Sequence, residues 1–212
     1  MATKLRGIRN GLIRYVEETI LPSYEGVDTA HGLEHILTVT KNALSITKHY
    51  NVDPELVYVI ASYHDIGIRF GRDDHHLTSG KWLYDDSTLR NFFSEEEILL
   101  MREAVEDHRA SSKHPPRSIY GAIIAEADRD LSPNHVIERC AQFAIAHNPE
   151  ADHERLVQIC LSHLKEKYGD GGYLKLYLYA PSNVEGLKTI RALLREDKME
   201  PKVQEALRKF GH

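Results

Sequence analysis

The sequence predicts an all-α protein, and three observations support this fold class. Apolar residues recur at intervals of three and four through most of the chain, as on one face of a helix. Helix-start signals such as Asp53-Pro54 and Ser132-Pro133 precede several of these stretches. Only residues 173–179 alternate weakly as a strand would, and they fit either a short strand in a hairpin or an aromatic lid segment.

The first three helices follow from apolar spacing and from the breaks between them. A helix is expected from Arg6 to about Ile20, and a second from about His31 to Tyr50. The third begins at Pro54, where the missing N–H of proline is harmless. It is apolar around most of its circumference and ends at His64-Asp65, as expected of a helix in the centre of a domain.

The remaining helices are delimited by capping residues and turn signals. Ser94 with Glu97 makes a capping box, and Ser182 with Glu185 offers a second one before the C-terminal helices. We expect further helices over residues 76–84, 94–108, 119–129, 133–145 and 151–168.

Composition excludes several classes of protein. The 212 residues suit one domain, 1–212, and 42% hydrophobic with 28% charged residues is ordinary for a globular chain. A formal net charge of -5 provides no basic field for extended nucleic acid. No signal peptide or apolar run long enough for a membrane span is visible, so we expect a cytoplasmic protein. Cys140 and Cys160 are expected to be buried thiols.

Histidine is unusually frequent, with 13 copies, and several copies fall with carboxylates at the ends of predicted helices. A helical bundle can bring such positions together in one metal site. Imidazole nitrogen with carboxylate oxygen suits Fe, Mn, Co, Ni or Zn, and the lack of suitably spaced cysteines argues against a structural zinc site. The candidates are His31, His35, His64, Asp65, His76, His108 and Asp128.

Five ordered segments resemble the HD superfamily of metal-dependent phosphohydrolases. The family pattern has a histidine on one helix, a His-Asp doublet on the next and a distant aspartate. The resemblance covers about residues 25–135, and we expect residues 136–212 to be a helical extension that packs on this region. The matching segments are Asp28 to Val39, Ser62 to Gly67, His76 to Gly80, Val105 to Arg109 and Ala127 to Asp130.

The resemblance implies a set of ligands for one or two divalent ions, drawn from Mn, Fe, Co, Ni, Zn or Mg. A first ion would be held by four side chains, those of His35, His64, Asp65 and Asp128. His76 and His108 would be available to a second ion, and Asp65 would bridge the two. His75 lies beside His76, so the ligand at this point could be either residue.

The function implied is hydrolysis of a phosphate ester of a nucleotide or other small metabolite by a metal-activated water. Asp65 and His31 take catalytic roles, and Arg129, Lys113 and Arg117 are candidates to bind substrate phosphate. Two alternatives stay open, a di-iron oxygenase of the HD type and a non-catalytic, metal-binding regulatory module. The expected partner is a small phosphorylated substrate, with no membrane and no extended nucleic acid, and a homodimer stays open.

Overall fold

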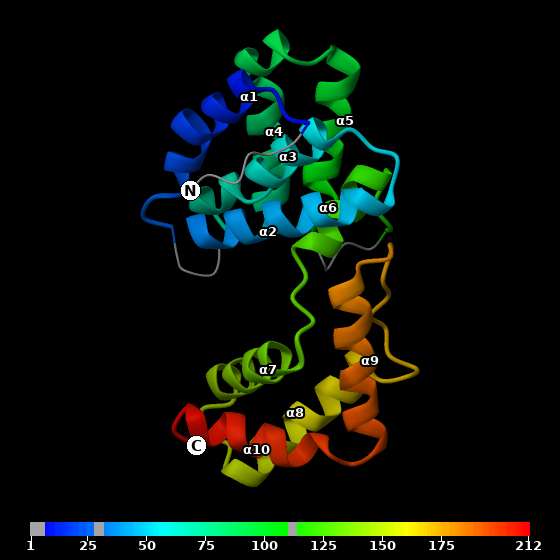
Figure 1. Cartoon of the computed structure of the whole chain (residues 1–212). Coiled ribbons are helices and arrows are strands. Elements are labelled where there is room, and N and C mark those ends of the chain that lie inside the picture. The colour runs from blue at the N-terminus through cyan, green and yellow to red at the C-terminus, as the bar shows by residue number, and fades with distance from the viewer. Residues whose placement is uncertain (1–6, 28–31, 110–113) are drawn as a thin grey trace. The chain divides into compact units, whose positions relative to one another are not determined.

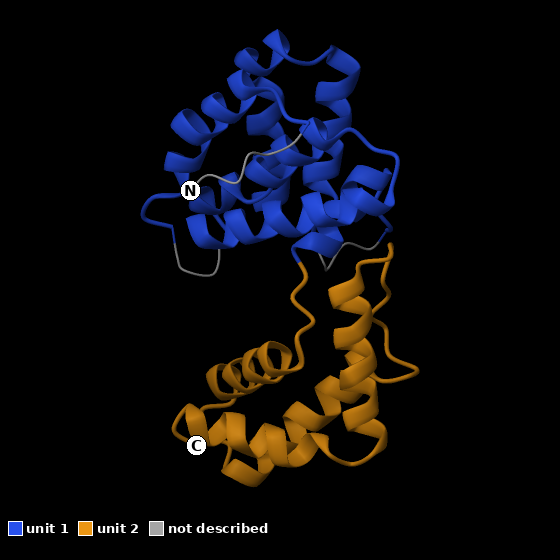
Figure 2. Ribbon diagram, in the orientation of Figure 1, with its two compact units in different colours: residues 1–128 blue, residues 129–212 orange. Residues whose placement is uncertain are grey.

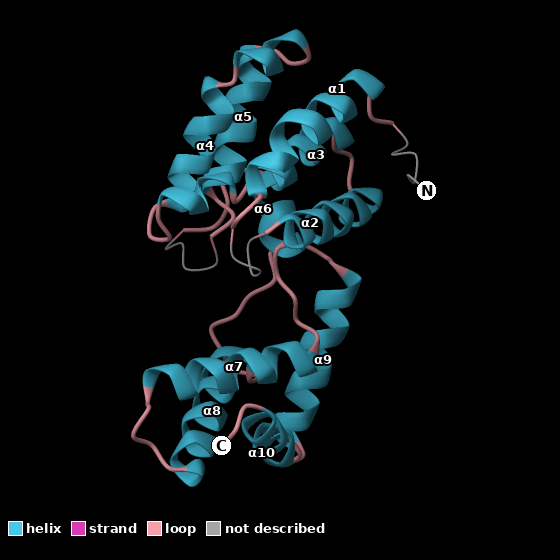
Figure 3. Cartoon of the chain, turned by 90° about the vertical axis from the view of Figure 1, so that its left-hand side faces the viewer, coloured by secondary structure: helices cyan, strands magenta, loops and turns pink. Residues whose placement is uncertain are grey.

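The structure is a computed structural model of the chain, and it describes residues 7–27, 32–109 and 114–212. These residues form helices and loops without a strand, which confirms the all-α prediction (Figure 3). The chain divides into two compact units, residues 1–128 and 129–212 (Figure 2). The expected single domain 1–212, with a C-terminal extension packed on it, stays a prediction, since each unit is described by itself.

Within its described residues, the first unit contains six α-helices and several short helical turns (Figure 1). The long N-terminal helix of the prediction is instead a short α-helix that widens into a π-helix and ends in a 3-10 turn. In chain order the elements are α1 (Asn10–Tyr15), η1 (Val16–Ile20), η2 (Leu21–Tyr24), α2 (Leu33–Ile46), η3 (Thr47–His49), α3 (Pro54–Tyr63), η4 (Ile66–Phe70), α4 (His75–Asp85), η5 (Ser87–Asn91), α5 (Glu95–Glu106) and α6 (Ile119–Ala127).

Helix α3 is the centre of this unit, as its uniformly apolar sequence predicts. Each of its residues from Glu55 to Tyr63 is buried, and it packs against α2, α4, α5 and α6. The side chain of Asp53 accepts a hydrogen bond from the N–H of Glu55, so the predicted start at Pro54 is confirmed. The Ser94 and Glu97 capping box at the start of α5 is also confirmed.

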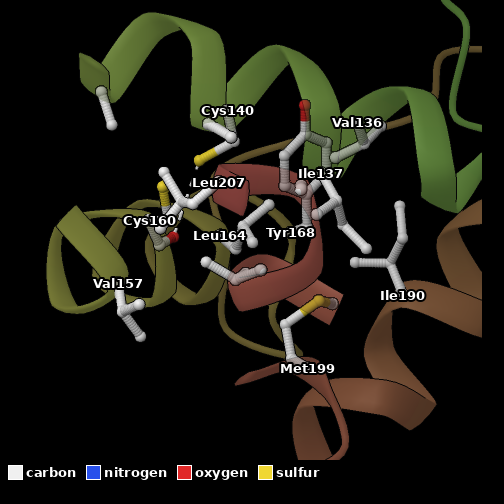
Figure 4. Packing of buried hydrophobic residues seen from close by; sticks show 14 of the residues in the cluster. Val136, Ile137, Cys140, Val157, Cys160, Leu164, Tyr168, Ile190, Met199 and Leu207 are labelled. Carbon is white, nitrogen blue, oxygen red and sulfur yellow. Dashed lines mark hydrogen bonds between the residues drawn. The ribbon is translucent and has the colours of Figure 1, made fainter. Parts of the chain in front are cut away.

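The second unit contains α7 (Pro133–His147), α8 (His153–Tyr168), α9 (Pro181–Arg195) and α10 (Met199–Lys209). Their apolar faces share one core, which includes Val157, Leu164, Ile190 and Leu207 (Figure 4). Cys140 from α7 and Cys160 from α8 lie within it as free, buried cysteines, as predicted. Burial of this apolar face is what holds four amphipathic helices together.

Residues 173–179 form part of the loop between α8 and α9. The option of a short strand there is wrong, and the option of an aromatic lid segment stays a prediction. The second capping box does not form, because α9 begins at Pro181 with Ala180 as its N-cap, two residues earlier than a box at Ser182 requires. Ser182 is therefore already inside the first turn. No helix in the described part of the chain is long and apolar enough to cross a membrane.

Candidate metal centre

The His64-Asp65 doublet lies where α3 stops and the backbone turns. Helix α3 ends at Tyr63, His64 follows as its cap, and Asp65 precedes the 3-10 turn η4. On a straight helix these side chains would diverge by about 100 degrees. Here the turn brings His64 Nε2 to 3.4 Å from Asp65 Oδ2. Both side chains are buried, so the polar pair is placed inside the unit by the end of its central helix.

A first group of ligands forms around the Oδ2 atom of Asp65. His35, from the first turn of α2, places its Nε2 3.5 Å from that oxygen and 3.3 Å from His64 Nε2. Asp128, directly after α6, places its Oδ1 3.2 Å from His35 Nε2. The side chain of Asn42 donates to the carbonyl of Ala127 at 3.3 Å, which ties the end of α6 to α2. The structure therefore brings together the four residues predicted to hold a first ion.

A second group forms around the other oxygen of the same carboxylate. Asp65 Oδ1 lies 3.3 Å from His75 Nε2 and 3.3 Å from His108 Nε2. The two imidazole Nε2 atoms are 3.2 Å apart. The ligand atoms of His35, His64 and Asp65 lie within 4.8 Å of one another, and so do those of Asp65, His75 and His108. Asp65 thus faces one group with each oxygen, as a bridging carboxylate would.

Three of the histidine rings are held by the backbone three residues earlier. Nδ1 of His64 contacts the carbonyl oxygen of Ala61 at 2.8 Å. The same contact joins His75 to Arg72 at 2.7 Å and His108 to Val105 at 2.6 Å. A carbonyl oxygen can only accept, so each Nδ1 carries the proton. In the neutral ring the Nε2 lone pair then points into the centre, where a metal ion could accept it.

Charges in the centre favour ionised carboxylates. Burial alone would raise the pKa of Asp65, but His64, His108 and His35 hold it well below its usual range. Burial opposes protonation of His35, yet Asp128 and Asp65 together raise its pKa to about 9. Burial lowers the pKa of His75. The carboxylates are therefore anionic at neutral pH, and a cation placed among them would compete with a proton on His35.

His76 is the one predicted ligand that the structure places elsewhere. Helix α4 begins at His75, and neighbouring residues on a helix point about 100 degrees apart. The Nε2 of His75 lies in the centre, whereas His76 lines a cavity of about 290 Å³ together with Asp107 and Arg117. The geometry favours His75 over His76 as the ligand, and the choice between them stays a prediction.

Arg117 is engaged in an ion-pair network rather than in the metal centre. Its Nε donates to Asp107 Oδ1 at 3.0 Å, and its Nη2 donates to Glu106 Oε2 at 2.8 Å. Burial lowers the pKa of this guanidinium, but Asp107 and Glu106 outweigh that effect and raise it. Because Asp107 precedes His108, we interpret Arg117 as a residue that fixes the end of α5. A role for Arg117 in substrate binding stays a prediction.

The other predicted site residues divide into two cases. His31 and Lys113 lie outside the described residues, so their roles stay predictions. Arg129 belongs to the second unit, where its Nη1 donates to the carbonyl of Lys175 at 2.8 Å. Its guanidinium also lies 5.1 Å from the centre of the Tyr177 ring. A role for Arg129 in phosphate binding also stays a prediction.

Ser79 and Gly67 position His75, a role that the sequence analysis did not assign. The Oγ of buried Ser79 accepts a hydrogen bond from the N–H of Gly67 at 2.8 Å. A Cβ atom at residue 67 would lie 2.5 Å from the His75 carbonyl oxygen. Glycine is thus required by the close approach of α4 and not by an unusual backbone angle. The adjacent doublet and the His-x-x-Ser-Gly segment were the sequence signals for this contact.

The donor set fits a divalent ion. Imidazole nitrogens and carboxylate oxygens converge without a thiolate, because both cysteines lie in the core of the second unit. Such mixed donors suit Mn, Fe, Co, Ni or Zn better than soft metals. Side chains from α2, the end of α3, α4, the end of α5 and the end of α6 supply them.

Comparison with known proteins agrees with this geometry. Residues 32–131 match the family model described as HD domain. Comparison with curated proteins gave no match, and comparison with solved structures gave none. The matched region contains the six residues assembled around Asp65, which are His35, His64, Asp65, His75, His108 and Asp128. The chain therefore contains an HD domain at residues 32–131.

Proposed function

We propose that the chain is a metal-dependent phosphohydrolase that acts on a phosphate ester of a nucleotide or another small metabolite. The observation that carries this proposal is the position of Asp65, whose two oxygens face two separate histidine groups. HD domains are generally metal-dependent phosphohydrolases, which supports the reaction class. A net charge of -5 favours small substrates over extended nucleic acid.

Some residues of the chain would hold metal ions, and backbone groups would hold the ligand rings in position. His35, His64 and Asp128 would hold one ion with Asp65 Oδ2, and His75 with His108 would hold another with Asp65 Oδ1. A bound divalent ion supplies a water of lowered pKa and neutralises charge on a phosphoryl oxygen. The hydrogen bonds from the three Nδ1 atoms keep the rings in place, so the ligands need no reorganisation.

A leaving oxygen also needs a proton, and His31 is our candidate donor. It precedes His35 by four residues in the sequence. Its role rests on that spacing. Lys113 and Arg129 stay candidates for substrate phosphate through their charge and their nearness in sequence to His108 and Asp128.

Turnover by the purified chain tests the proposal. The protein is stripped with a chelator, reloaded separately with Mn, Co, Ni, Zn or Mg, and offered phosphomonoesters, dinucleotides and cyclic nucleotides. We expect phosphate release with at least one metal, and a loss of at least about 100-fold in the Asp65→Asn variant. The matched control is Asp86→Asn. Asp86 accepts a hydrogen bond from Tyr63 at 2.5 Å and belongs to neither ligand group.

The two alternatives predict different results. A chain that purifies with two irons, consumes oxygen and releases no phosphate would be an HD-type oxygenase. A chain that holds metal and turns over no member of the panel under any loading would favour the regulatory module. Equal activity in Asp65→Asn and wild type would contradict the proposed site.

A further inference from the structure

The second unit has a basic cavity that lies outside the region matched by the HD family. Its volume is about 350 Å³, near the lower end of the range for small-molecule sites. Every residue that lines it lies between 170 and 195, whereas the family match ends at residue 131. Neither the metal centre nor the family match therefore indicates which ligand this cavity binds.

Three cations line the cavity from one face of α9. Lys188, Arg191 and Arg195 are spaced by three and four residues, so their side chains lie above one another on the helix. Asp170 is the one acidic residue among the lining side chains. Glu185, which does not line the cavity, places its Oε2 3.8 Å from Lys188 Nζ. Three cations thus face two carboxylates, and the remaining positive charge favours an anion. Leu176 and Leu187 add an apolar wall, which can contact a compact non-polar part of a ligand.

Arg191 and Arg195 each have guanidinium N–H groups that could donate to a ligand. Nε of Arg191 donates to the carbonyl of Tyr168 at 3.2 Å, which fixes the base of this side chain at the end of α8. The side chain of Arg195 makes no hydrogen bond within the described part of the chain, and its Nε is 3.8 Å from Asp170 Oδ2. The Nε of Arg191 is 4.0 Å from Asp170 Oδ1. Both distances exceed an ordinary hydrogen bond, so Asp170 only partly offsets the two guanidinium groups.

We propose that this cavity binds a small molecule bearing a phosphate group. A guanidinium presents parallel N–H donors that match two phosphate oxygens, and a lysine adds a compact positive charge. Arg191 is anchored in advance, which reduces the entropy lost when a ligand binds. Arg195 and Lys188 would close on the anion from the next turns of the same helix. The site is separate from the HD domain, so it would remain if the proposed reaction were wrong.

Calorimetric titration of the full, metal-stripped chain with inorganic pyrophosphate at low salt tests this proposal. We expect saturable binding of about one pyrophosphate per chain. The double variant Lys188→Gln with Arg195→Gln should bind at least about tenfold more weakly, because two charge-assisted contacts are lost. The matched control is Lys202→Gln with Arg208→Gln, which removes the same charges from exposed positions on α10 and should change the affinity less than about twofold.

A variant expected to bind more tightly distinguishes the loss of ligand contacts from the loss of the fold. Asp170→Asn removes the carboxylate that competes with the ligand, so it should strengthen pyrophosphate binding by about fivefold. Loss of fold cannot produce that result. No saturable binding, equal binding by the Lys188/Arg195 variant and wild type, or weaker binding by Asp170→Asn would each overturn the proposal. Metal content and phosphate release, measured on the same wild-type protein, report separately on the proposed hydrolase.

Discussion

Each ring of the second ligand group is positioned by its own stretch of backbone. His75 and His108 contact the carbonyls of Arg72 and Val105 through Nδ1. That contact fixes both the tautomer and the direction of Nε2. It also means that a residue beside a ligand cannot replace it without a rotation of the whole helix. The choice between His75 and His76 is therefore a question of geometry, and a substitution can answer it.

His75→Ala should remove a ligand of the second ion, whereas His76→Ala should leave both groups intact. After reloading with manganese, we expect about one ion per chain in the first variant and about two in the second. Inductively coupled plasma mass spectrometry gives the counts. The reverse pattern, with metal lost only in His76→Ala, would restore the assignment made from the sequence motif.

An ion pair far from the centre makes the stability of the first unit depend on pH. Arg9 donates to Glu55 from its backbone N–H at 2.6 Å and from its side-chain Nε. Burial would raise the pKa of Glu55, but the contacts with Arg9 hold it below its usual value. A carboxyl whose folded-state pKa is depressed adds stability above its unfolded pKa, about 4.3, and loses it as pH falls through the folded value.

Glu55→Gln should therefore lower the free energy of unfolding by roughly 1–3 kcal/mol at pH 7. The difference from wild type should shrink as the pH falls below about 4. Urea unfolding followed by fluorescence of Trp82, the single tryptophan, reports on this unit. Glu18→Gln, at an exposed position, should change the free energy by less than about 0.5 kcal/mol. A Glu55→Gln deficit that is the same at pH 3 and pH 7 would contradict the ion-pair account.

At the scale of elements, the contact between η4 and α4 sets the spacing of the two ligand groups. The Oγ of Ser79 accepts from the N–H of Gly67, and the start of α4 lies directly against that glycine. This contact links the doublet, at the start of η4, to His75, at the start of α4. A displacement of α4 should therefore weaken metal binding by the second group more than by the first.

Gly67→Ala should cost about 1–3 kcal/mol through overpacking and should weaken binding of the second ion more than the first. The added Cβ would lie 2.5 Å from the His75 carbonyl oxygen. Titration of the metal-free protein with cobalt, followed by absorbance, separates the two binding steps. Gly171→Ala is the control, since nothing lies within 4 Å of its Cβ position. Equal loss of both ions in Gly67→Ala would argue that the glycine acts only on overall folding.

Local signals made most helices of the first unit predictable, and longer-range packing decided the rest. The cap at Asp53 and the box at Ser94 act within a few residues, so sequence reasoning could find them. The π-helix Val16–Ile20 has no such local signature. At Ser182 the same reasoning failed, because Pro181 occupies the first turn and moves the cap to Ala180.

The candidate site was predictable to the extent that its ligands lie in short motifs. His35, His64, Asp65, His108 and Asp128 occur in segments that resemble one family in order, and the structure brings all five together. The sixth position was ambiguous because the rotation of α4 about its axis depends on its packing against η4. The anchoring contacts through Nδ1 could not be predicted, since they depend on the backbone three residues earlier.

At the scale of the whole molecule, the chain carries two compact units with different chemistry. The first contains the HD domain and the metal centre, and the second has its own core of four helices. No low-complexity linker marks the boundary after Asp128, which is why composition alone suggested one domain. The basic cavity of the second unit gives it a binding function of its own in our account.

If Asp65 joins the two ligand groups, its substitution should empty both. The metal content of the purified and reloaded chain measures this. Mass spectrometry of wild type, Asp65→Asn and Asp86→Asn should give about two ions per chain in wild type and in Asp86→Asn. Asp65→Asn should retain few or none, because both groups lose their shared carboxylate. Equal metal in Asp65→Asn and wild type, or none in any of the three, would contradict the assembly of the centre around Asp65.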